Sequence, residues 1–266
     1  MKNHAFKNIT TLAGWYWAMA RKPYSLLCAL FAIQQLAMLL LLAASKGNLG
    51  MGYATLYMGG MQWTAFGFAF LGAGVLSARA LMQASGRTKA GYTLLTLPMP
   101  RWQLLCAGTL ACAVMQLGVV ALQLLLFFAA CGPVSAVSHA LAQTLIQGNL
   151  PAANLYVQLV NNDLLVLLLP TRPTAALALL GTLAASAIML PCMFLHRGWR
   201  RLAAAAMALA GAACCCILVV GERYLVINPN TRNARGYCMV AGAIALVLVA
   251  AAWLWGLHAV KRAQIV

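Results

Sequence analysis

Long apolar runs separated by short polar segments make up most of this chain. The hydrocarbon core of a bilayer is about 30 Å thick, and a helix needs roughly 20 apolar residues to cross it. Six runs approach or exceed that length: residues 24–44, 53–78, 102–131, 175–195, 202–220 and 237–259. The pattern therefore predicts an all-α, polytopic membrane protein with six transmembrane helices.

The segment before the first run has a different pattern. Phe6, Ile9, Ala13, Trp17 and Ala20 recur at spacings of three and four residues, and basic residues lie near both ends of the segment. This spacing is typical of an amphipathic helix that lies at the membrane surface. We therefore expect residues 1–23 to form an interfacial elbow helix, with an irregular cytoplasmic tail as the alternative.

Residues 132–174 are harder to assign. The stretch 150–169 is apolar enough for a seventh span, but Asn154, Gln158, Asn161, Asn162 and Asp163 lie within it. A single Asp near the middle of a membrane costs about 2.5 to 3.5 kcal/mol on insertion scales. Counts of Lys and Arg on the two sides hardly distinguish six spans from seven, so the polar residues favour six. Residues 132–174 then form an external or re-entrant cap of one or two short helices.

Composition agrees with a membrane location, because 64% of the residues are hydrophobic and only 8% are charged. The formal net charge is +16, with 18 Lys and Arg against two acids. These basic residues cluster at the ends of the apolar runs, which is the arrangement that orients membrane proteins with basic loops in the cytoplasm. We expect both termini to be cytoplasmic, the lipid bilayer to be a partner and nucleic acid not to be one.

The nine cysteines do not form a disulfide framework. Most of them lie inside the apolar runs, where cysteine behaves as a small apolar residue. Cys131 and Cys238 lie near the predicted outer ends of their spans. The sequence leaves a disulfide between these two residues open.

The chain lacks the motifs of an energy-transducing or catalytic site. It contains no GxxxxGK[ST] phosphate-binding loop, no HExxH and no GxSxG. Its two acids, Asp163 and Glu222, are far apart in sequence and lie in or beside predicted outer loops. We expect no catalytic residues, no bound metal and no cofactor on this chain, and we do not expect an enzyme.

Residues 79–101 form the longest polar interruption with a compact basic cluster. The first part can continue the second helix until Gly86, and residues 92–97 can form a short helix that Pro98 and Pro100 end. Arg101 and Trp102 can anchor the next span at the interface. The segment is either a docking surface for a cytoplasmic partner or a solvated basic loop.

Within it, AGYTLLTLPMPRWQLLCAG resembles the segment that joins the second and third spans in six-span permeases of ABC exporters, the type-2 class. The sequence departs from that pattern where the family often has an acidic residue upstream, since only Gln83 and Ser85 lie there, and at Thr109, where a basic residue is common. The matching positions are Gly91, Tyr92, Leu94, Leu95, Thr96, Leu97, Pro98, Arg101, Leu104, Leu105 and Gly108.

The resemblance implies that this segment receives the ATP-driven closure of a separate nucleotide-binding subunit, which would hold ATP and Mg. A second permease copy or homologue would complete the transporter, in a bacterial cytoplasmic membrane, and the cargo would be a peptide, drug or lipid-like molecule. The coupling residues would then be Arg87, Lys89, Tyr92, Leu94, Leu95, Leu97, Pro98 and Arg101.

The substrate path would lie between two permease copies, lined by the first, second and fifth spans. The polar candidates are Gln34 and Gln35 in the first span and Thr55, Tyr57, Gln62 and Thr64 in the second. Hydrogen bonding between helices is the alternative role for these residues. The alternative function is a non-transporting anchor, assembly or immunity-type subunit of a membrane complex, and a secondary carrier ranks third.

Overall fold

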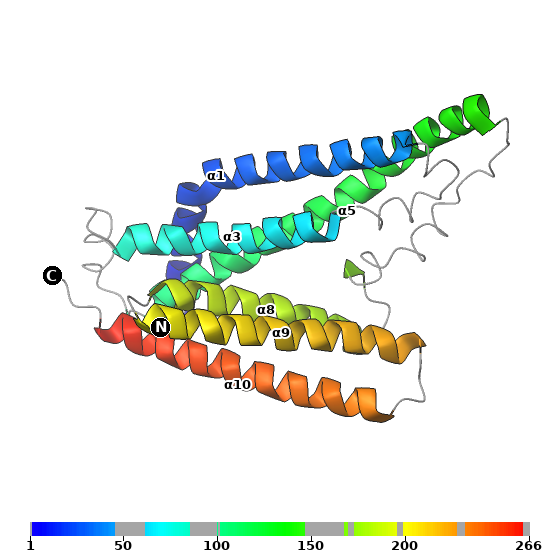
Figure 1. Ribbon diagram of the computed structural model, residues 1–266. Coiled ribbons are helices and arrows are strands. Elements are labelled where there is room, and N and C mark those ends of the chain that lie inside the picture. The colour runs from blue at the N-terminus through cyan, green and yellow to red at the C-terminus, as the bar shows by residue number, and fades with distance from the viewer. Residues whose placement is uncertain are drawn as a thin grey trace. The chain divides into compact units, whose positions relative to one another are not determined.

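Helices account for the secondary structure of the described part of this protein (Figure 1). The computed structural model describes residues 2–45, 62–85, 100, 102–146, 168–169, 173–195, 199–227 and 232–262. The helices are α1 (Lys2–Ala44), α3 (Gln62–Ser85), α5 (Trp102–Ile146), α8 (Pro173–Leu195), α9 (Trp199–Ile227) and α10 (Arg232–Arg262).

The lengths and composition of these helices identify a multi-pass membrane protein. Among the described residues, five helical stretches are long and apolar enough to cross a bilayer: Phe6–Ala44, Trp102–Val137, Pro173–Met193, Trp199–Gly221 and Arg235–Lys261. A shorter apolar stretch, Thr64–Arg79, lies in α3. Large apolar side chains such as Leu177, Leu209 and Leu246 are exposed on the helix surfaces, where lipid rather than water would cover them.

The chain divides into two compact units, which we call unit 1 and unit 2. Unit 1 comprises Met1–Tyr24, Gly72–Leu117 and Pro173–Val266, and unit 2 comprises Ser25–Leu71 and Gly118–Arg172. Helices α1, α3 and α5 each contribute residues to both units, whereas α8, α9 and α10 belong to unit 1. These last three helices contact one another in pairs (Figure 1).

The bounds of α8, α9 and α10 contain the fourth, fifth and sixth spans expected from the apolar runs. Their close packing depends on small residues, as is common between membrane helices. At Gly211 of α9, an added Cβ would lie 2.7 Å from the Sδ and Cε atoms of Met189 on α8. Glycine at this position therefore leaves room for the end of the Met189 side chain.

The N-terminal part of α1 packs on the first turns of α5. Leu12 and Tyr16 are buried with Leu104 and Ala107, and Ile9, Trp15 and Met19 pack against this cluster. The Tyr24 hydroxyl donates a hydrogen bond to the Met115 carbonyl at 2.9 Å. Residues 2–23 are thus helical, as the spacing of their apolar residues predicts, and are not an irregular tail. Their position at the membrane surface stays a prediction.

Two prolines expected at element boundaries instead lie inside helices. Helix α1 runs through Pro23 from the expected elbow into the first span, and α5 runs through Pro133 to Ile146. A proline removes one backbone hydrogen bond, but neighbouring groups in membrane helices can compensate for this. Around Pro133, Cys131 and Val134 are buried, so continuing the helix keeps apolar surface packed. Residues 132–146 of the expected cap thus belong to α5, and its residues 147–167 and 170–172 lie outside the described part.

Candidate functional site

The predicted coupling residues lie outside the described residues. These are Arg87, Lys89, Tyr92, Leu94, Leu95, Leu97, Pro98 and Arg101. The helices on either side of them are described: α3 continues past residue 78 to Ser85, and α5 begins at Trp102. The segment therefore joins the end of one apolar helix to the start of the next.

The last part of the family-like motif is buried in unit 1. The backbone N–H of Gln103 donates to the Pro100 carbonyl at 2.9 Å, which forms a turn at the start of α5. Leu104 and Leu105 have exposed fractions of 8% and 0%, and Leu104 belongs to the cluster that includes Tyr16 of α1. The start of α5, where the motif ends, is therefore packed on the N-terminal part of α1.

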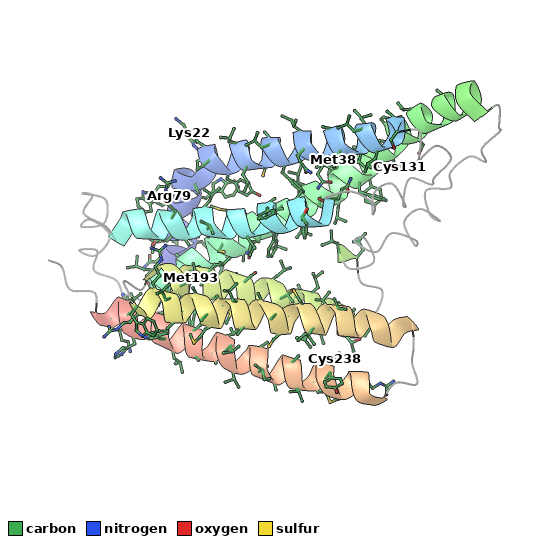
Figure 2. All side chains as sticks on the ribbon, viewed as in Figure 1. Lys22, Met38, Arg79, Cys131, Met193 and Cys238 are labelled. Carbon is green, nitrogen blue, oxygen red and sulfur yellow. The ribbon has the colours of Figure 1, made fainter. Side chains whose placement is uncertain are left out.

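Exposed basic side chains lie in unit 1. Arg21 and Lys22 lie on α1, Arg79 on α3, and Arg200 near the start of α9. Figure 2 shows Lys22, Arg79 and Met193 toward one end of unit 1, and Cys238 toward the other. The described cysteines form no disulfide.

Two of the polar residues expected on the substrate path lie together in unit 2. The Nε2 atom of Gln35 on α1 donates to the backbone carbonyl of Gln62 on α3 at 3.3 Å. Both side chains have an exposed fraction of 0%. The two glutamines thus link α1 and α3 within the apolar part of the protein.

These buried amides are incompletely hydrogen-bonded. Neither Nε2 nor Oε1 of Gln62 has a partner, and the Oε1 atoms of Gln34 and Gln35 also have none. A buried polar group left without a partner costs about 1 to 3 kcal/mol. The other residues expected on the substrate path are not part of this buried pair. Thr64 is exposed, and residues 55 and 57 lie outside the described part.

A second polar cluster lies in unit 1, where three helices meet. The Ser186 hydroxyl on α8 donates to Oε1 of Gln116 on α5 at 2.9 Å, and the Ser77 hydroxyl on α3 donates to the Gly74 carbonyl at 2.7 Å. Gln116 and Ser77 are buried. Only the Oε1 atom of Gln116 is paired in this way, since its Nε2 atom, like the amide of Gln62, has no partner.

The sequence interpretation did not single out Gln103, Gln116 or Gln123, all of which are buried on α5. The sequence could have identified them, because these three amides interrupt an apolar run. Gln116 and Gln123 are also seven residues apart, about two turns of a helix, and so lie on the same helix face. No pattern in the sequence identifies Ser186 in this way. Serine is common in membrane helices, and its pairing with Gln116 depends on residues that are distant in sequence.

No family model, curated protein or solved structure matches this chain.

Proposed function

We propose that this chain is the membrane-spanning permease subunit of an ABC exporter, with the ATPase activity on separate cytoplasmic subunits. The observation that carries the proposal is the family-like motif of residues 90–108, which joins two apolar helices of a multi-pass membrane protein. The sequence has no phosphate-binding loop of its own, so transport would require an ATP-hydrolysing partner.

The packing around the motif supports a coupling role. Closure of the ATPase subunits would press on the segment between α3 and α5. Helix α5 follows this segment, and its residues Leu104 and Leu105 are buried in unit 1. Because packed elements move as rigid bodies rather than deforming continuously, the push would shift α5 together with the N-terminal part of α1. The cargo class that follows from the resemblance is a peptide, drug or lipid-like molecule.

The partner is tested first. We expect the tagged chain, purified in mild detergent from its native membrane, to carry a stoichiometric soluble protein with a GxxxxGK[ST] loop, identified by mass spectrometry. Partners that include no ATPase would contradict the proposal. They would support the alternative, a non-transporting anchor, assembly or immunity-type subunit, whose effect should persist when ATP hydrolysis is blocked.

The coupling residues are tested in the assembled complex. Replacing Tyr92 and Arg101 together by Ala should leave the complex intact but separate ATP hydrolysis from export, because the segment would no longer transmit the closure. ATPase rate and export are measured in the same vesicles. Arg200→Ala is the control, since Arg200 is an exposed basic residue outside the motif. Unchanged export in the double variant would contradict the coupling role.

A further inference from the structure

The side chain of Gln62 is the strongest unexplained feature of the described structure. It is completely buried, and neither its amide nitrogen nor its amide oxygen has a hydrogen-bond partner. Native proteins pair most of their buried polar groups, so an unpaired group calls for an explanation. A ligand that supplies the missing partners is one such explanation.

Gln35 adds to the same site. Its Nε2 atom lies 3.3 Å from the Gln62 carbonyl, whereas its Oε1 atom has no partner. The pair therefore offers two acceptor oxygens and one NH₂ donor group that are unused. A ligand that matches this set would both donate and accept hydrogen bonds.

The surroundings of the pair select against charged ligands. The described helical residues of unit 2, 25–44, 62–71 and 118–146, include no Asp, Glu, Lys or Arg. Burying an ionised group without a counter-charge is far more costly than burying a neutral polar group that is hydrogen-bonded. The site is therefore suited to an uncharged ligand group.

We propose that Gln35 and Gln62 bind an uncharged carboxamide or peptide group inside the membrane. The inference rests on the proposed function for naming this ligand as the exported substrate. The ligand enters when α1 and α3 separate, because both side chains are fully buried in this structure. The hydrogen bond that joins them is 3.3 Å long, beyond the usual 2.7 to 3.2 Å range, so breaking it costs little.

The first test is thermal unfolding of the purified full chain in detergent. Gln62→Met removes the unpaired amide and keeps a flexible side chain of similar volume, so we expect the unfolding midpoint to stay the same or rise. Ser186→Ala is the control, which should lower the midpoint because it removes the donor to the buried Gln116 oxygen and leaves that amide without any partner. A fall for Gln62→Met as large as the control's would overturn the proposal, since Gln62 would then have a structural role.

The second test measures binding of a neutral peptide, N-acetyl-Leu-Leu-amide, by microscale thermophoresis. We expect the wild-type chain to bind it about tenfold more tightly than its fully N-methylated analogue, which lacks the N–H donors. The free-carboxylate peptide should also bind more weakly. The double variant Gln35→Leu with Gln62→Met should lose these preferences.

Equal binding of all three peptides by the wild-type chain, or binding of none, would overturn the proposal. So would an unchanged preference in the double variant. Both tests use the chain without an ATPase, so they separate this inference from the transport function. If the chain binds the neutral peptide selectively but never associates with an ATPase, the binding site is supported and the proposed transport function is contradicted.

Discussion

At the scale of single residues, buried polar side chains have two different environments. The Oε1 atom of Gln116 accepts a hydrogen bond from Ser186 at 2.9 Å while its Nε2 atom has no partner, whereas both amide atoms of the equally buried Gln62 have none. The first arrangement links α5 and α8, as polar residues between membrane helices commonly do. The second lowers stability, which a protein tolerates where function requires it.

Gly74 of α3 lies beside Gln116, where an added side chain would be crowded. A Cβ at residue 74 would overlap Leu190 Cδ1 and lie 3.1 Å from Gln116 Nε2. Gly74→Ala therefore requires the Leu190 side chain to move, and this overpacking should offset the stabilisation that alanine gives a helix. The measurement is the thermal unfolding midpoint in detergent.

The control for this prediction is Gly67→Ala in the same helix, because a Cβ at Gly67 would meet nothing within 4 Å. That variant should keep or slightly raise the midpoint, since alanine favours the helix more than glycine does. Equal effects of the two substitutions would show that helix α3 is not closely packed at residue 74.

At the scale of elements, the N-terminal part of α1 is held by side-chain packing. Tyr16 has an exposed fraction of 1%, and it packs with Leu104 and Ala107 of α5 and edge-on against Trp15 at 5.5 Å. An elbow that only rested on the membrane surface would not need such a contact. The packing links this part of α1 to the start of α5.

Replacing Tyr16 with Ala should loosen this element. Removing a buried aromatic side chain costs about 3 to 5 kcal/mol, because the apolar contacts are lost and a cavity is left. We expect faster proteolysis within residues 1–23 and a lower unfolding midpoint. Phe6→Ala is the control, since Phe6 is 70% exposed and should tolerate the change. Identical proteolysis of the two variants would contradict a packed N-terminal segment.

At the scale of the whole molecule, charge and helix length give a prediction of orientation. The chain carries 18 basic residues and only two acids, so internal ion pairs cannot neutralise most of the basic side chains. Basic residues near the helix ends favour the cytoplasmic side of a bacterial membrane. With six spans, both termini should therefore lie in the cytoplasm.

Reporter fusions in a bacterial host measure this orientation. Alkaline phosphatase fused after Ser45 or after Ile227 should be active, because both positions would follow an outward crossing. Green fluorescent protein fused after Val266 should fluoresce, since it would stay in the cytoplasm. The reverse pattern, with phosphatase activity only after Val266, would show the opposite orientation.

The sequence alone determined the class of fold and the approximate positions of several helices. The apolar runs at 175–195, 202–220 and 237–259 lie within α8, α9 and α10, because a bilayer requires a minimum length of apolar helix. Proline positions were a poorer guide to where helices end. Pro23 and Pro133 lie inside helices, where each costs one backbone hydrogen bond. Continuing the helix keeps Ala20 and Tyr24 buried on either side of Pro23, and Cys131 and Val134 on either side of Pro133.

Only the tertiary structure decided which polar residues meet. Gln34, Gln35 and Gln62 stand out in the sequence because amides are costly in an apolar run, yet their spacing cannot show that Gln35 reaches the Gln62 backbone. The same holds for Gln116 with Ser186, which are 70 residues apart. Hydrogen bonds between helices depend on helix rotation and packing, and a pattern along one chain does not specify these.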